Sequence, residues 1–148
     1  MSDTLYRARA PRFNHVAMSL PAELLDETNS ADIARFWGEV FGFVELPQMT
    51  EPGRRLVLSA GALDQFVYLI ADDTPMSCPR LDHYGISVGS LEDLVAAHER
   101  AVAFAATDPR VDIIPPNVDD FEVLKIHAFY CGFLLPMMLE VQYWEFPS

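Results

Sequence analysis

Two histidines stand at equivalent places in a short sequence that occurs twice. Residues 14–20 (NHVAMSL) align with residues 82–88 (DHYGISV), and every aligned pair agrees in chemical type. Both segments have the apolar and β-branched content of strands, in which alternate side chains share a face. On that face His15 and His83 are each followed by two small residues. Space beside the imidazole is typical of a cavity wall.

Glu140 is the third candidate for chemistry. It lies in the middle of an apolar strand segment, where an unpaired carboxylate would be unfavourable to bury. The side chains predicted to share its face are Met138, Gln142 and Trp144. Coordination of a metal ion would stabilise this carboxylate, and so would an arginine or histidine partner; a solvent-exposed strand face is the alternative. Two imidazoles and one carboxylate would leave open coordination positions, as in catalytic metal sites. We therefore predict one divalent metal ion at His15, His83 and Glu140.

Two tyrosines lie close to these residues in the predicted strands. Tyr68, in residues 66–69, takes the place that Glu140 has in residues 138–141, and could be a fourth ligand, a donor to a bound anion, or a packed strand residue. Tyr130 could donate a proton at the metal site or simply form part of the wall. His127 lies an odd number of residues from Tyr130 and should face the other way. His98 falls on a helix stripe and is predicted to pack against a sheet.

The elements that must position these residues also repeat. In the first half, a strand over residues 13–20 and an acidic connection over 22–28 precede a helix capped at Asn29 and Ser30 and ended by Gly42. Its apolar stripe comprises Ile33, Phe36, Trp37, Val40 and Phe41. Strands over 43–46, 55–60 and 65–71 follow.

The second half begins again with its histidine strand. Ser90 caps a helix whose predicted stripe comprises Leu91, Leu94, Val95, His98, Ala101 and Val102. Strands follow over residues 111–114, 124–133 and 137–146, with the first closed by Pro115-Pro116 and a loop over 117–120. Each half therefore reads βαβββ.

The whole chain of 148 residues is predicted to be one α+β domain. Residues 1–11 form a loose lead-in, residues 12–71 the first βαβββ module, 72–81 a linker and 82–146 the second module. The two modules are expected to form a cupped mixed sheet around a central cavity.

Composition excludes several classes of function. A net charge of −12 argues against a nucleic-acid partner, which would require clustered lysine and arginine. No apolar run reaches the roughly 18 residues that span a membrane. The two cysteines, Cys78 and Cys131, lack zinc-site spacing, and a reducing cytoplasm is the expected compartment.

Paired βαβββ modules with a histidine on each first strand and a glutamate on the last strand resemble the vicinal oxygen chelate superfamily, which includes glyoxalases, extradiol dioxygenases, epimerases and bleomycin-resistance proteins. Residues 34–43 (ARFWGEVFGF) look like that family's first helix and its exit, and 81–88 and 138–141 look like its later ligand strands. The resemblance covers roughly residues 12–146. It implies that His15, His83 and Glu140 bind a divalent ion (Fe, Mn, Zn or Ni). The open coordination positions of this ion would bind two neighbouring oxygens of a small substrate.

Departures from the family pattern narrow the expectation. Tyr68 stands where the four-ligand enzymes of the family have Glu or Gln, which favours a three-ligand site like that of extradiol dioxygenases. Tyr130, ten residues before Glu140, resembles the tyrosine of those enzymes. A metal-free drug-binding protein like those that confer bleomycin resistance is the alternative, since the negative charge and Trp144 suit a cationic ligand; a non-catalytic remnant is a third. We also expect a homodimer, with the modules paired within the chain or across the interface.

Overall fold

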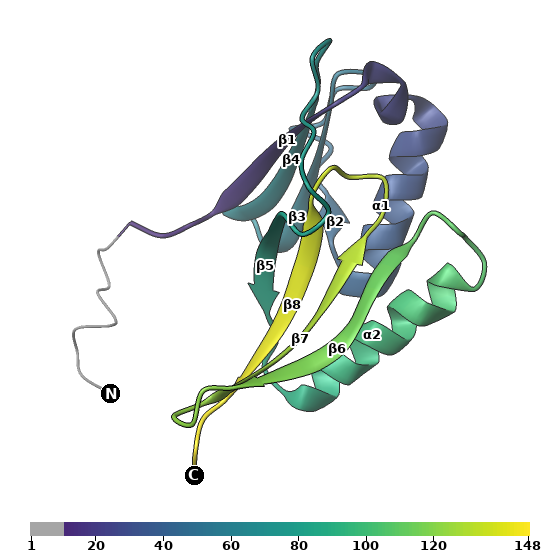
Figure 1. Cartoon of the computed structure of the whole chain (residues 1–148). Helices are drawn as coiled ribbons and strands as arrows, with labels where there is room; N and C mark the ends of the chain where they lie inside the picture. The colour runs from purple at the N-terminus through teal and green to yellow at the C-terminus, as the bar shows by residue number, and fades with distance from the viewer. Residues whose placement is uncertain (1–10) are drawn as a thin grey trace.

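The structure is a computed structural model that describes residues 11–148 (Figure 1). The predicted lead-in therefore lies, apart from Pro11, outside the described residues. The first module contains β1 (His15–Leu20), the 3-10 helix η1 (Ala22–Leu25), α1 (Glu27–Phe41), β2 (Val44–Glu45), β3 (Arg55–Ala62) and β4 (Gln65–Ala71). The second contains β5 (His83–Ser87), α2 (Leu91–Ala105), β6 (Asp112–Asp120), β7 (Lys125–Gly132) and β8 (Met138–Glu145). The predicted pair of βαβββ modules is confirmed.

The eight strands form two separate sheets within the described part of the chain. Their orders are β1-β4-β3-β2 and β5-β8-β7-β6, so each histidine strand is an edge strand. β1 runs parallel to β4, and β5 runs parallel to β8. The registers also match, because Ala17 lies opposite Tyr68 as Gly85 lies opposite Glu140. Within one chain the predicted cup is thus divided into two halves.

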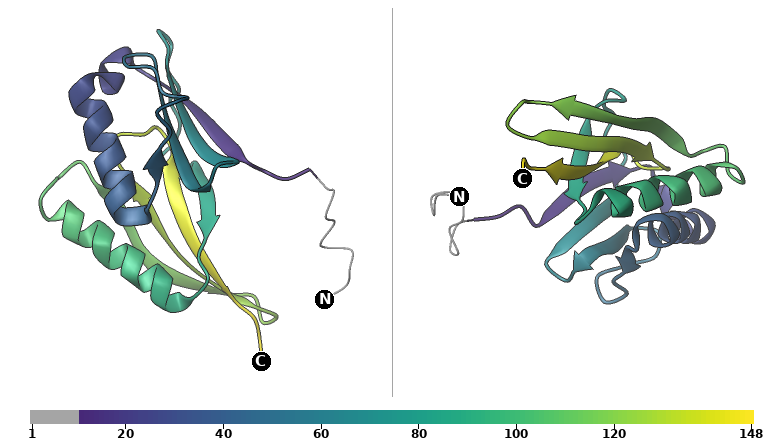
Figure 2. Two further views of the ribbon diagram at one scale, coloured as in Figure 1. Left: turned by 180° about the vertical axis from the view of Figure 1, so that it is seen from behind. Right: turned by 90° about the horizontal axis from the view of Figure 1, so that it is seen from below.

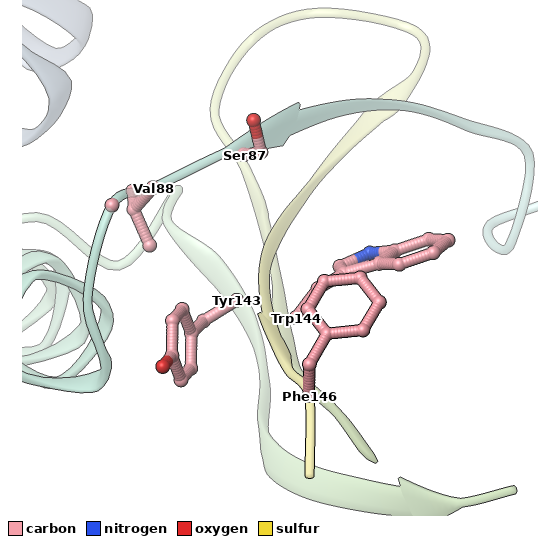
Figure 3. A pocket seen from close by; sticks show the side chains of 6 residues that line it. Ser87, Val88, Tyr143, Trp144 and Phe146 are labelled. Atoms are coloured by element: carbon pink, nitrogen blue, oxygen red, sulfur yellow. The ribbon is translucent and has the colours of Figure 1, made fainter. Parts of the chain in front are cut away.

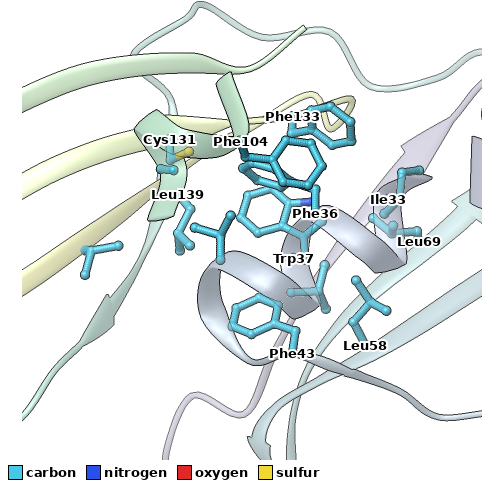
Figure 4. Packing of buried hydrophobic residues seen from close by; sticks show 14 of the residues in the cluster. Ile33, Phe36, Trp37, Phe43, Leu58, Leu69, Phe104, Cys131, Phe133 and Leu139 are labelled. Carbon is cyan, nitrogen blue, oxygen red and sulfur yellow. The ribbon is translucent and has the colours of Figure 1, made fainter. Parts of the chain in front are cut away.

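The two helices pack against each other and hold the modules together (Figure 2). A single hydrophobic core runs through both modules (Figure 4). Phe36 of α1 meets Phe104 of α2 edge-on at 5.0 Å and stacks on Phe133, just after β7, at 4.5 Å. Each sheet consequently has one face on this core and one open face, and His15 and His83 lie on the open faces. Among the described residues no helix has the length and apolarity needed to cross a membrane.

Helix α1 starts earlier than predicted. The Asp26 side chain accepts a hydrogen bond from the backbone N–H of Asn29 at 2.7 Å, so Asp26 is the N-cap and the prediction of Asn29 and Ser30 as caps was wrong. The Asn29 side chain is used elsewhere, donating to the Glu23 carbonyl at 2.9 Å. At the other end Gly42 adopts the left-handed conformation (φ 73°) and ends the helix as predicted.

Two further predictions in the second module need correction. The buried stripe of α2 is Leu94, Ala97, Ala101 and Phe104, whereas Leu91, Val95 and Val102 are exposed. Strand β6 also continues through Pro115 and Pro116 to Asp120, with a register shift between Ile114 and Asn117. The prolines are tolerated because β6 is an edge strand and they coincide with the irregularity.

A charged network connects the two modules beside the helix pair. Arg110 donates to Asp108 at 2.7 Å and to Asp32 of α1 at 2.9 Å, while its guanidinium lies 5.1 Å from the centre of the Phe133 ring. The side-chain and backbone hydrogen bonds from Arg110 to Asp108 lower the pKa of Asp108 to about 2. Arg100 of α2 adds a hydrogen bond to the Val40 carbonyl at the end of α1.

We predict that this network makes folding stability depend on acid pH. Because the pKa of Asp108 is lowered from 3.8 to about 2, its contribution is complete above pH 3.8 and lost as pH falls through about 2. Asp108→Asn should lower the melting temperature at neutral pH and flatten the loss of stability in that window, as thermal melts against pH would record. Asp64→Asn, which removes an exposed ion pair with Arg12, is the control and should change little. Equal effects of the two variants would contradict the assignment.

Candidate metal centre

His83 and Glu140 meet on the open face of the second sheet. Their strands β5 and β8 are parallel neighbours, and the residue directly opposite Glu140 is Gly85. The Glu140 side chain reaches the imidazole of His83, which lies two residues before Gly85. His83 Nε2 and Glu140 Oε2 lie 2.8 Å apart.

A backbone contact fixes the orientation of the His83 ring. Its Nδ1 lies 2.8 Å from the carbonyl oxygen of Leu81, which can only accept a hydrogen bond. Nδ1 therefore carries a proton, and Nε2 faces the Glu140 carboxylate. Metal-binding histidines are oriented in this way by a hydrogen bond at the second ring nitrogen.

Glu140 is buried, with only 7% of its surface exposed. Its Oε1 accepts a hydrogen bond from the Gln142 amide nitrogen, which leaves Oε2 for His83. A buried carboxylate whose donors are neutral amide and phenol groups is poorly compensated unless a positive charge lies beside it. The lone pairs of Oε2 and Nε2 would repel each other at this distance unless a proton or a cation lies between them.

The donor set suits a divalent transition metal. Imidazole nitrogen and carboxylate oxygen are ligands for Zn, Mn, Fe and Ni ions. Two ligands at bond lengths of about 2.1 Å and adjacent positions on one ion lie roughly 3 Å apart, close to the spacing of 2.8 Å between Nε2 and Oε2. His83 and Glu140 could therefore hold one ion without leaving their strands.

Tyr130 forms the third side of this centre. It lies directly opposite Glu140 on β7, and its ring meets the His83 ring edge-on at 5.1 Å. Burial raises the pKa of the Tyr130 hydroxyl, and the charge of Glu140 and a hydrogen bond with it raise the pKa further. The phenol thus keeps its proton and can donate it towards the carboxylate or a bound ligand.

His15 lies on the first sheet and does not join this pair. Its ring stacks on Phe66 at 4.8 Å, and its Nδ1 lies 2.7 Å from the side-chain oxygen of Asn14. As in His83, an acceptor at Nδ1 leaves the lone pair of Nε2 free. No group of three metal-ligating side chains occurs within residues 11–148. Tyr68 lies on the same open face as His15, opposite Ala17.

The remaining histidines have other neighbours. His127 pairs with Glu145 at 2.6 Å and lies 5.8 Å from the Tyr143 ring, so it faces away from Tyr130, as the spacing predicts. His98 meets Phe129 edge-on at 5.2 Å, in the predicted helix–sheet packing.

The sequence did not reveal the roles of two groups that support the centre, the Leu81 carbonyl and the Gln142 side chain. The Leu81 carbonyl that orients His83 gives no signal in a sequence, because every residue has a carbonyl. Gln142 was predicted to share a strand face with Glu140, because the two residues are two positions apart in the sequence. The hydrogen bond that makes it a support for the carboxylate depends on side-chain torsions.

Comparison with known proteins adds evidence on the fold. No family model matches the sequence. No curated protein matches it either. Similar solved structures include a glyoxalase/bleomycin resistance protein from Albidiferax ferrireducens (14% identity, 88% of this chain and 97% of that chain covered, TM-score 0.61).

Two further solved structures are also similar. Lactoylglutathione lyase from Agrobacterium tumefaciens is 13% identical, with 90% of this chain and 93% of that chain covered and a TM-score of 0.60. The fosfomycin resistance protein FosX from Listeria monocytogenes, solved with Mn(II) and dihydroxypropylphosphonic acid, is 12% identical, with 89% and 91% covered and a TM-score of 0.57. The chain therefore has the paired βαβββ fold of the glyoxalase, bleomycin resistance and dioxygenase proteins, which is the fold of the vicinal oxygen chelate superfamily.

Proposed function

We propose that this protein is a divalent-metal-dependent enzyme whose small substrate chelates the metal through two neighbouring oxygens. The observation that supports this most strongly is the opposed pair of His83 Nε2 and Glu140 Oε2, 2.8 Å apart, in which the Glu140 carboxylate is buried. Solved structures of the same fold include an Mn(II) complex of FosX.

A second copy of the chain would supply the third ligand. β1 and β5 are edge strands with unpaired backbone groups on one side, and such edges favour pairing with another chain. Pairing β1 of one copy beside β5 of another would bring His15 towards His83 and Glu140 of the partner subunit. In a twofold dimer the same contact forms twice, giving two equivalent centres.

The residues around the centre have separate roles in this proposal. His15, His83 and Glu140 hold the ion, and Gln142 keeps the Glu140 carboxylate turned towards His83. When bound, the ion would act as a Lewis acid that stabilises negative charge on the substrate oxygens. Tyr130 keeps a proton on its hydroxyl beside the carboxylate and can give it to a substrate oxygen.

The position of Tyr68 favours a three-ligand centre like that of extradiol dioxygenases. Tyr68 lies opposite Ala17 in the register that Glu140 has opposite Gly85, and it offers a phenol where a fourth ligand would be a carboxylate or amide. With three protein ligands, more positions stay open for a substrate that binds through two oxygens.

A metal-free binding protein for a drug or other small molecule is the second candidate. The observations that favour it are the half-exposed Trp144, the exposed Phe146 and the net charge of −12, which together suit a planar cation. Binding of such a cation that is unaffected by a chelator would favour this candidate over the enzyme.

We predict that the protein binds Mn²⁺ through His83 and Glu140. Isothermal titration of chelator-treated, untagged protein should give a Kd that rises by more than about 100-fold in His83→Ala and Glu140→Gln, since even outer-shell partners contribute about 10–100-fold. His127→Ala is the matched control, because His127 forms a similar pair with Glu145 on the other face of the sheet. Absence of Mn²⁺ binding, or an equal loss in the control, would contradict the proposal.

We predict a homodimer with a mass twice the 16.6 kDa of one chain, measured by light scattering at micromolar concentration. Mixing His15→Ala with His83→Ala subunits should restore tight Mn²⁺ binding to about a quarter of all sites, because one of the two sites in each mixed dimer receives intact residues from both chains. Each variant alone should lack tight sites. A monomer, or no recovery after mixing under conditions that exchange subunits, would contradict a shared centre.

We predict that Tyr130 ionises above the ordinary tyrosine pKa of 10.0. The difference in ultraviolet absorbance between wild type and Tyr130→Phe during alkaline titration isolates this group. Glu140→Gln should lower the Tyr130 pKa, since the carboxylate charge beside the hydroxyl is removed. Glu145→Gln should leave it unchanged, and a shift of equal size in that variant would count against contact between Tyr130 and Glu140.

A further inference from the structure

A pocket of about 500 Å³ lies at the end of the second sheet, where β8 continues beyond β5 (Figure 3). β5 ends at Ser87, whereas β8 runs on to Glu145. The residues lining the pocket are Ser87, Val88, Gly89, Tyr143, Trp144 and Phe146.

The wall of this pocket contains two aromatic rings that are largely uncovered. Trp144 is 45% exposed and Phe146 is 59% exposed. Their ring centres lie 6.3 Å apart and their planes are tilted by 44°, so each ring keeps a free face. Stacking of a flat apolar group on exposed aromatic faces of this kind is energetically favourable.

Backbone polar groups also face this pocket. The last hydrogen bond from the β5 side goes from the Val88 N–H to the Gln142 carbonyl. Strand alternation turns the N–H and C=O of Trp144 the same way as those of Gln142, beyond the end of β5. A ligand there could use them as donor and acceptor.

A chain of hydrogen bonds connects this pocket with the candidate metal centre. The indole N–H of Trp144 donates to the Gln142 side-chain oxygen at 2.8 Å, and the Gln142 amide nitrogen donates to Glu140 Oε1. Because an indole can only donate, it fixes which end of the Gln142 amide faces Glu140. Trp144 thus belongs both to the pocket and to the support of the carboxylate.

We propose that the pocket binds a planar aromatic group of the substrate that carries no negative charge, and that Trp144 acts through Gln142 as a positioning residue for Glu140. The identification of this group as part of the substrate rests on the proposed metal-dependent function. Four residues of strand separate Glu140 from Trp144, about 13 Å between Cα atoms. The substrate is therefore elongated, with its oxygen pair at His83 and Glu140 and its aromatic group beside Trp144.

The local charges favour a neutral aromatic group over an anionic one. Glu140 and Glu145 lie on the same strand as Trp144, and no Lys or Arg side chain lines the pocket. An aromatic carboxylate or sulfonate would have to enter this negative field without a basic partner.

The first experiment measures binding of 2-naphthol to chelator-treated protein by calorimetry. Trp144→Ala should raise the Kd roughly tenfold, as expected for loss of one stacking partner and its apolar contact. Phe121→Ala removes an aromatic ring of similar exposure (56%) in the β6–β7 loop and should leave the Kd unchanged. Failure of 2-naphthol to bind wild type, or equal affinities for wild type and Trp144→Ala, would contradict the proposal that this pocket binds an aromatic group.

The second experiment separates the ring of Trp144 from its N–H. Trp144→Phe keeps a stacking surface but has no donor, so 2-naphthol affinity should change by less than about threefold while Mn²⁺ affinity falls about tenfold. Gln142→Leu should reduce Mn²⁺ affinity by a similar factor and leave 2-naphthol binding intact. Unchanged Mn²⁺ affinity in both variants would overturn the positioning role.

These outcomes distinguish the inference from the proposed function. Absence of Mn²⁺ binding in wild type would overturn the proposed function together with the positioning role of Trp144. If Mn²⁺ binds wild type and 2-naphthol does not, the aromatic pocket fails while the metal centre at His83 and Glu140 stands.

Discussion

The 2.8 Å contact between His83 Nε2 and Glu140 Oε2 is the constraint on which the rest of the site depends. The Leu81 carbonyl holds a proton on Nδ1 of His83, so Nε2 is the ring nitrogen that faces the carboxylate, and a proton or a cation must lie between Nε2 and Oε2. Burial of the Glu140 side chain reduces the screening of this contact by water. The surrounding residues are consistent with a place for positive charge, because Gln142 takes the other carboxylate oxygen and Tyr130 adds a protonated hydroxyl.

The packing of the helices explains why this centre has two ligands in one chain. α1 and α2 join the modules through Phe36, Phe104 and Phe133, and Arg110 connects them through Asp32. This arrangement leaves β1 and β5 as edges of separate sheets. The core that stabilises the chain therefore leaves both histidine edges free for a partner. In the proposed dimer, fold stability and completion of the site would therefore depend on different surfaces.

Sequence patterns predicted the features that depend on local chemistry. The repeated histidine strand, Gly42 at the end of α1, the face shared by Glu140 and Gln142, and the opposite directions of His127 and Tyr130 all follow from strand or helix periodicity. The resemblance of the two modules to a known family added the fold.

Features that depend on tertiary packing could not be predicted from local sequence patterns. Several residues could cap α1, and only packing selects Asp26. Pro115 and Pro116 end a strand by local rules, yet an edge position and a register shift let β6 continue. The separation of His15 from Glu140 depends on which module surfaces meet, and a repeat in the sequence does not specify that choice.

The most direct test of the central claim is anomalous X-ray scattering from crystals grown with Mn²⁺. The account predicts a peak within about 2.3 Å of both His83 Nε2 and Glu140 Oε2, with His15 of a second subunit as the third protein ligand. The result that would contradict it is a structure at saturating Mn²⁺ in which His83 still contacts Glu140 directly and no peak lies beside them.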